Sequence, residues 1–296
     1  MNYLNKYSLI SCHQFGFQKG ISTIDAILKL TEFIYRSLNK KLHTISVFVD
    51  LKKTFDTVNH DILLRKLSCY GIRGIPLGLI KNYLNTRSQC VKIGSVSSGY
   101  KTINIGVPQG SIMGPLLFLL YINDLPNVSS VLSSVLFADD TTLFASDICH
   151  YRLIESFNSE LEKVAMWTKA NMLSLNVNKT FAVSFTNREP GDCFHMLFFD
   201  GEQVQFNTSG KFLGLIIDSS LNFRDHISMI YNKISKTIGI FYRLKQIVPD
   251  YILLNLYYTF IYPYLLYCNV IWGGTHITVL APLRILQKKN CPTHCG

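Results

Sequence analysis

The chain has 296 residues, of which 48% are hydrophobic and only 16% are charged, so wholesale disorder is excluded and a large core with one to three subdomains is expected. Its net charge of +10 favours a polyanionic partner, although a generically basic protein is the plain alternative. Residues 221–296 carry eight Lys or Arg against two Asp, and this asymmetry favours a dedicated binding surface.

The first half of the chain predicts strands and helices in alternation. A helix begins near Ser22, which is a suitable N-cap, and a buried strand over 45–50 follows it. A helix over about 57–70 has Gly71 as its stop, and a hairpin is expected over 89–105. The next helix runs from Ser111 and must end before Pro126, because proline breaks the helical hydrogen-bond pattern.

The second half predicts a hairpin and then mainly helices. Two short apolar runs, 135–138 and 143–145, flank a tight turn. A helix over about 151–170, a strand over 181–185 and a small hairpin around 200–201 follow. Beyond residue 221 an apolar stripe at helical spacing contains Ile227, Ile230, Ile234, Ile238 and Phe241. The fold class predicted is α+β, with a mixed centre followed by a helical subdomain.

Residues 251–272 contain no charge and are long enough to span a bilayer. Asn255, Pro263 and Asn269 interrupt this segment, and its tyrosines are spread throughout instead of gathering at the two ends. We therefore expect a buried pair of helices hinged near Pro263, and no membrane partner.

Three aspartates form the first candidate site. Asp139 and Asp140 lie at the tip of the predicted hairpin, where two adjacent carboxylates repel each other unless a cation such as Mg²⁺ binds them. Asp50 ends the buried strand and delivers a third carboxylate to an edge of the sheet. This set suits two-metal phosphoryl transfer, with two Mg²⁺ ions or, as a substitute, Mn²⁺. The alternative is that Asp139 and Asp140 are ordinary turn residues.

Four further residues are weaker candidates. Phe55 follows Asp50 by five residues and either lies beneath the sugar of a nucleotide or, as its position alone favours, belongs to the core. Gln109 and Gly110 lie in a loop that opens a helix, a place that attracts phosphates. Lys179 is a candidate proton donor to pyrophosphate, or a solvated lysine.

Several segments together resemble the reverse transcriptases of non-LTR (LINE-type) retrotransposons. Motifs A, B and C of that family resemble FVDLKKTFDTVNH at 48–60, GVPQGSIMGP with the following residues at 106–126, and FADD at 137–140. Residues 14–23 resemble the family's fingers-to-palm segment, and residues 175–180 resemble its motif D. Residues 212–214 resemble the primer-grip motif E, and residues 262–273 with 286–289 resemble the thumb. The resemblance covers nearly the whole chain in the family's order.

The resemblance implies a right-hand polymerase, with partial fingers over 1–44, a palm over 45–220 and a helical thumb over 221–296. The palm would be an antiparallel sheet backed by helices. The implied activity is RNA-directed DNA polymerisation, in which deoxynucleotides extend a DNA primer on an RNA template. The alternative is a catalytically inactive remnant that still binds nucleic acid. An intracellular protein is expected, and the family implies the nucleus.

The resemblance also implies a role for individual residues. The metal ligands would be Asp50, Asp139, Asp140 and the Leu51 carbonyl. The three aspartates and Lys179 would be catalytic. The substrate would be bound by Phe55, Gln109 and Gly110. The residues implied to bind the nucleic acid are Phe212, Leu213, Gly214, Lys233, Lys236, Arg243 and Lys245.

The chain departs from the family pattern in places. Gln18 stands where many relatives carry Arg, and Thr54 where many carry Ala. Because the chain begins almost at the QFGF segment and stops just after 286–289, we expect a fragment that lacks most of the fingers and part of the thumb.

Overall fold

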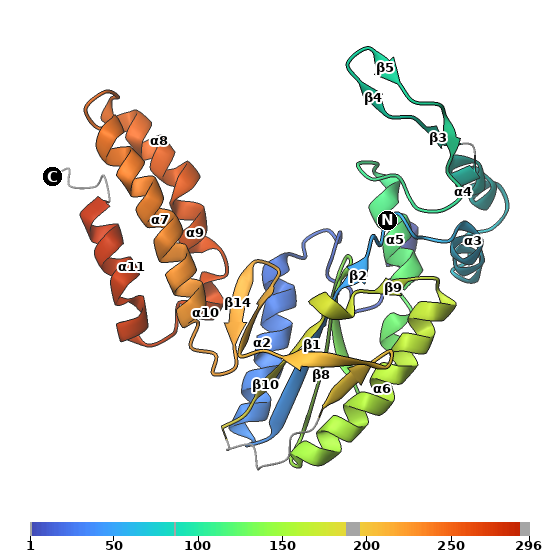
Figure 1. Ribbon diagram of the computed structural model, residues 1–296, viewed down its shortest axis with the longest axis horizontal. Helices are drawn as coiled ribbons and strands as arrows, with labels where there is room; N and C mark the ends of the chain where they lie inside the picture. The colour runs from blue at the N-terminus through green and yellow to red at the C-terminus, as the bar shows by residue number, and fades with distance from the viewer. Residues whose placement is uncertain (1, 86, 188–195, 291–296) are drawn as a thin grey trace.

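The computed structural model describes residues 2–85, 87–187 and 196–290. A central sheet forms the base of the molecule, and two arms rise from it (Figure 1). One arm contains α3, α4, α5 and a long hairpin, and the second arm contains a short hairpin and the helices after residue 223. Residues 291–296 of the predicted thumb lie outside the described residues.

The central sheet has six strands in the order β11-β12-β10-β1-β8-β7. Neighbouring strands are antiparallel except β10 and β12, which are parallel, so the predicted antiparallel sheet is in fact mixed. The strands are β1 (His43–Val49), β7 (Ser133–Phe137), β8 (Asp140–Asp147), β10 (Phe181–Phe185), β11 (Leu197–Phe199) and β12 (Glu202–Phe206).

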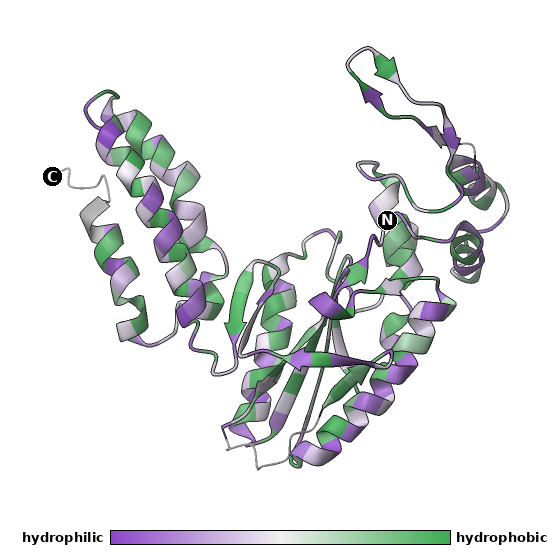
Figure 2. Ribbon diagram, viewed as in Figure 1, coloured by the Kyte–Doolittle hydropathy of each residue, from purple (hydrophilic) through white to green (hydrophobic). Residues whose placement is uncertain are grey.

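Two helices cover the two faces of the sheet. All seven residues of β1 are buried, as expected for a strand enclosed on both sides. Ile45 and Val47 belong to one apolar core with α6 (His150–Ala170), and Phe48 belongs to a second core with α2 (Thr23–Asn39). Ser22 is the N-cap of α2, as predicted, and its hydroxyl donates to Asp25 at 2.7 Å. Figure 2 shows hydrophobic and hydrophilic residues alternating along α6.

The arm beside β7 consists of three helices and a projecting hairpin. The predicted hairpin over 89–105 forms as two short ladders, and every residue from Ser88 to Thr102 is exposed. The elements of this arm are α3 (His60–Cys69), α4 (Gly74–Asn85), β3 (Ser88–Gln89), β4 (Lys92–Ile93), β5 (Val96–Ser97), β6 (Lys101–Thr102) and α5 (Met113–Ile122).

Short elements connect these layers. They are α1 (Asn2–Lys6), β2 (Leu51–Lys52), η1 (Leu125–Val128), β9 (Ser174–Leu175) and η2 (Val177–Lys179). The β2–β9 pair joins the residues after β1 to the segment before β10, through the pairing of Leu51 with Leu175.

The second arm begins with a hairpin and continues as helices. Its elements are β13 (Ser209–Phe212), β14 (Leu215–Asp218), α7 (Arg224–Leu244), α8 (Asp250–Phe260), α9 (Tyr262–Leu266), α10 (Asn269–Trp272) and α11 (Ile277–Asn290). The four isoleucines of the predicted stripe on α7 are buried, and Phe241 packs against the same core.

The prediction of a buried helix pair over 251–272 was wrong. The segment forms α8, α9 and α10, and side chains such as Tyr251 and Val270 are exposed. Each short helix buries only part of its surface, so its outward residues stay in contact with solvent. No helix within the described residues is both long and apolar enough to cross a membrane.

Candidate active site

The sheet places the three candidate carboxylates at one edge. Strand β1 pairs with β8 antiparallel, and the last pair of the ladder is Val49 with Thr141. Asp50 follows Val49 and Asp140 precedes Thr141, so the two aspartates lie on neighbouring strands at the same end of the sheet. Asp139 is in the two-residue turn between β7 and β8.

The electrostatics of the turn agree with this proximity. The side chains of Asp139 and Asp140 keep substantial contact with solvent. Partial burial raises the pKa of Asp140, and repulsion from Asp139 and then Asp50 raises this pKa further. Asp139 and Asp50 are therefore close enough to Asp140 to disfavour its charged form, which is the condition that a bound cation relieves.

The carboxylates do not form a closed metal cage. Within the described part of the chain, no group of three or more His, Cys, Asp or Glu side chains is placed to hold one metal ion together. The donor chemistry still fits a hard divalent cation, because all three side chains offer carboxylate oxygens. The ligand set stays a prediction.

Residues that the sequence analysis did not select hold two of these carboxylates. The Asn176 side-chain amide donates to Asp50 Oδ2 at 2.7 Å, and the Asn176 backbone N–H donates to the Asp50 carbonyl at 2.9 Å. The backbone N–H of Asp50 donates to Thr180 Oγ1 at 3.2 Å. In the β7–β8 turn, Asp139 accepts a hydrogen bond at its Oδ2 from the Thr54 hydroxyl at 3.3 Å. The loop that carries Lys179 thus orients Asp50.

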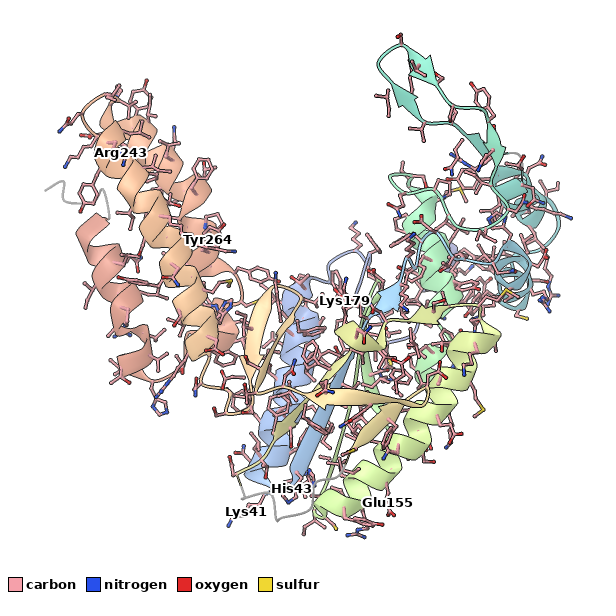
Figure 3. All side chains as sticks on the ribbon, in the orientation of Figure 1. Lys41, His43, Glu155, Lys179, Arg243 and Tyr264 are labelled. Carbon is pink, nitrogen blue, oxygen red and sulfur yellow. The ribbon has the colours of Figure 1, made fainter. Side chains whose placement is uncertain are left out.

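A cavity of about 110 Å³ adjoins this edge of the sheet and contains Lys179, as well as Lys211, which the sequence analysis missed. Figure 3 shows Lys179 at the end of the sheet from which the arms rise, and His43 at the opposite end. The lining residues are Phe48, Val49, Asp50, Asp140, Thr141, Thr142, Lys179, Phe181, Lys211 and Phe212. Carboxylates and ammonium groups thus face the same small space.

The three predicted substrate-binding residues lie in two segments, Phe55 shortly after β2 and Gln109 and Gly110 in the loop before α5. Phe55 is half-buried, and its ring centroid lies 4.7 Å from that of Phe118 on α5. The Phe55 carbonyl accepts the Val107 N–H at 2.7 Å, which ties the segment after Asp50 to the loop before α5. In that loop Gln109 is exposed and donates to Asp56 at 3.0 Å, and Gly110 has no atom within 4 Å of where a Cβ would stand.

The segment 212–214 forms the tight turn between β13 and β14. Leu213 and Gly214 have φ values of 45° and 89°, a combination typical of a two-residue hairpin turn in which glycine is favoured. The Tyr267 hydroxyl donates to the Leu213 carbonyl and lies 3.1 Å from the Thr23 hydroxyl. Phe212 is 3% exposed and packs against Phe48, so its side chain anchors the turn.

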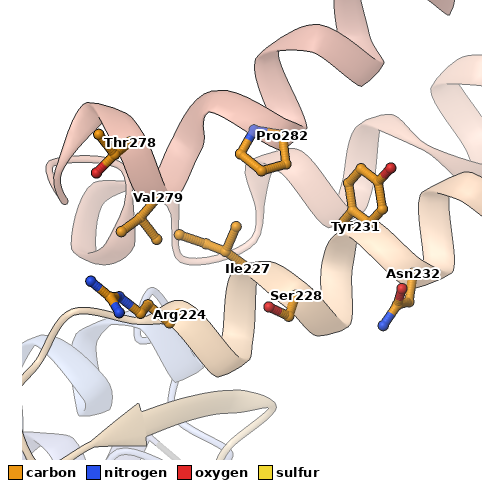
Figure 4. A pocket seen from close by; sticks show the side chains of 8 residues that line it. All are labelled: Arg224, Ile227, Ser228, Tyr231, Asn232, Thr278, Val279 and Pro282. Carbon is orange, nitrogen blue, oxygen red and sulfur yellow. The ribbon is translucent and has the colours of Figure 1, made fainter.

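The four predicted phosphate-contacting cations, Lys233, Lys236, Arg243 and Lys245, are exposed on α7 and at its C-cap. The ammonium of Lys233 lies 5.1 Å from the ring centroid of Tyr264, and Figure 3 shows Arg243 near the far end of α7. At the base of this arm, a cavity of about 680 Å³ lies between the first turns of α7 and α11, with Arg224 at one end (Figure 4). None of its lining residues is a candidate catalytic residue.

The chain matches a known class of polymerase. Residues 1–217 match the family model described as reverse transcriptase (RNA-dependent DNA polymerase), so the chain belongs to that family of nucleotidyltransferases. The structure resembles telomerase from Candida albicans in complex with a fragment of telomeric RNA, with a TM-score of 0.55 and 12% identity over 98% of this chain and 53% of that one. That likeness concerns the fold.

Curated relatives narrow the family to the polymerases of non-LTR retrotransposons. The chain is 30% identical over 223 residues to the probable RNA-directed DNA polymerase from transposon BS of Drosophila melanogaster, covering 73% of this chain and 24% of the relative. It is 29% identical to the RNA-directed DNA polymerase from mobile element jockey of Drosophila funebris, covering 93% and 31%. The X-element polymerase of Drosophila melanogaster is 28% identical, with 94% and 31% covered. The chain spans less than a third of each relative.

Proposed function

We propose that this chain is an RNA-directed DNA polymerase that extends the 3′-hydroxyl of a DNA primer with deoxynucleotides. The observation that carries the proposal is the convergence of Asp50, Asp139 and Asp140 at one end of the sheet, where partial burial and then repulsion from Asp139 and Asp50 raise the pKa of Asp140. Membership of the reverse transcriptase family supports it.

The carboxylates of Asp50, Asp139 and Asp140, with the backbone carbonyl of Leu51, would hold two Mg²⁺ ions, for which Mn²⁺ is a substitute. Bound divalent ions supply Lewis-acid chemistry, lowering the pKa of an attacking hydroxyl and neutralising charge on the leaving pyrophosphate. The chain's own contribution is orientation. Asn176 holds the Asp50 carboxylate, and the Thr54 hydroxyl holds that of Asp139.

The residues around the carboxylates would bind the nucleotide. The ammonium groups of Lys179 and Lys211 attract a triphosphate, and Lys179 would protonate the pyrophosphate. The ring of Phe55, immobilised against Phe118, would exclude a 2′-hydroxyl and so select deoxyribose. Gln109 and the open backbone at Gly110 would contact the base pair and the template.

The second arm would bind the primer and its duplex. The turn at Leu213 and Gly214, anchored by Phe212 and Tyr267, would position the primer strand. Lys233, Lys236, Arg243 and Lys245 would contact backbone phosphates, which position the duplex without reading its sequence. Such contacts make binding weaken steeply with added salt.

Primer extension on an RNA template with Mg²⁺ and deoxynucleotides tests the proposal. We expect extension by the wild type and a loss of at least about a hundredfold in Asp139→Asn, which keeps the shape of the side chain but removes its charge. Asp61→Asn, at an exposed position in the first turn of α3, is the matched control and should extend normally.

Binding to primer–template at several salt concentrations separates two explanations of a failure. If the wild type binds in a salt-sensitive manner without extending the primer, the chain is a nucleic-acid-binding remnant. If Asp139→Asn extends as well as the wild type, the assignment of the carboxylates is refuted.

A further inference from the structure

The segment before the first long helix extends the central sheet at its β7 edge. The backbone N–H of Phe15 donates to the Leu136 carbonyl at 2.7 Å, and the N–H of Leu136 donates to the His13 carbonyl at 2.9 Å. Gln14 thereby forms a parallel bridge with Leu136, three residues before Asp139. A piece of chain more than a hundred residues away in sequence is thus fastened to the strand that leads into the candidate catalytic turn.

The side chain of Gln14 connects this segment to the turn itself. Gln14 is 1% exposed, and its Oε1 accepts the N–H of Gly16 at 2.7 Å and the N–H of Ala138 at 3.3 Å. Both partners are donors, so the carbonyl oxygen and not the amide nitrogen must face them. The Gln14 Nε2 is buried without a hydrogen-bond partner among the described residues, which indicates that the acceptor contact determines how this side chain lies.

The turn needs such support because its first residue is strained. Ala138 has a φ of 57°, in the left-handed region that residues with a Cβ disfavour. Gly16 packs directly against it, since a Cβ on Gly16 would stand 2.4 Å from the Ala138 nitrogen. The Gln14 oxygen and the close approach of Gly16 therefore converge on the one residue that sets the direction of the turn.

We infer that Gln14 is a positioning residue for the catalytic turn. By accepting the Ala138 N–H it holds this alanine in its left-handed conformation and so presents Asp139 and Asp140 to the metal and nucleotide. The inference rests on the proposed function only for the consequence in catalysis. Its structural part, that Gln14 determines the conformation of the turn, stands independently.

Amide exchange in the wild type is the first test. In protein labelled with ¹⁵N-alanine, we expect the Ala138 amide to exchange slowly, as a buried hydrogen-bonded donor does. Exchange as fast as that of a solvent-exposed amide would overturn the inference, and this measurement needs neither a variant nor activity.

The variant Gln14→Met keeps the volume and removes the acceptor. We expect the Ala138 amide to exchange about tenfold faster, and Mn²⁺ binding followed by electron paramagnetic resonance to weaken by about tenfold, the effect of one buried hydrogen bond. Thr44→Val is the matched control, because it also removes a fully buried polar atom, at the far end of β1, and that atom has no partner among the described residues. It should change neither readout.

A second substitution separates positioning from general stability. Glycine adopts a positive φ without strain, so Ala138→Gly should restore most of the Mn²⁺ affinity lost in Gln14→Met. Mn²⁺ affinity that is unchanged in Gln14→Met, or equally reduced in Thr44→Val, would overturn the inference. If the wild type binds Mn²⁺ but extends no primer, the proposed function fails while the role of Gln14 is still decided by exchange and binding.

Discussion

His226 connects the hairpin β13–β14 to the helical arm, and its titration offers a sharp test of the structure. The side chain is 2% exposed, its Nδ1 accepts the Ile216 N–H at 3.3 Å, and its ring lies edge-on to Trp272 with centroids 6.0 Å apart. Burial, with a smaller repulsion from Lys233, lowers the pKa of His226 to about 4 from an ordinary 6.5.

The sign of the effect follows from proton binding. Below pH 6.5 His226 binds a proton in the unfolded chain but stays neutral in the folded protein until the pH approaches 4. The free energy of unfolding therefore decreases as the pH falls. With the two pKa values of 6.5 and about 4, the free energy of unfolding at pH 5 should be about 2 kcal/mol lower than at pH 8. The loss reaches about 3 kcal/mol once the pH is below 4.

Urea unfolding of the wild type and of His226→Gln, each at pH 8 and pH 5, isolates this contribution from the other titrating groups. The wild type should lose about 2 kcal/mol more than the variant between the two pH values. An equal loss in both proteins would refute the reasoning. Should the variant not fold, an NMR titration of His226 in the wild type that gives a pKa near 6.5 refutes it equally.

Two further substitutions test the packing and the charge of the catalytic turn. Gly16→Ala places a Cβ against the Ala138 backbone and should cost about 2 kcal/mol in urea unfolding, whereas Gly78→Ala in α4 meets open space and should cost nothing; equal stability of the two variants would contradict the contact. Asp140→Asn removes a carboxylate whose pKa is raised by burial and repulsion, so at pH 7 without metal it should raise the free energy of unfolding. Because this side chain is exposed and screened by solvent, we expect the free energy of unfolding to rise by only about 0.5 kcal/mol. This gain should vanish at low pH, where the carboxylates are protonated. A variant less stable than the wild type at pH 7 would contradict the repulsion.

Local chemistry made much of the architecture predictable. The alternation and length of apolar runs identify β1 and the β7–β8 hairpin, and the capping chemistry of Ser22 marks the start of α2. The stripe on α7 could be predicted because a helix that packs on one side repeats its buried residues with the helical period. Where apolar residues occurred without such a period, as over 251–272, composition alone suggested more burial than the helices have.

The sequence by itself determined which residues carry charge at the candidate site: Asp50 after a buried strand, and two aspartates in a turn. Only the tertiary structure decided what holds them there. Asn176 lies 126 residues from Asp50 along the chain, Thr54 lies 85 from Asp139, and Gln14 lies 124 from Ala138. Periodicity and turn preferences act over a few residues, whereas these hydrogen bonds exist only once strand register and helix packing have brought distant segments together.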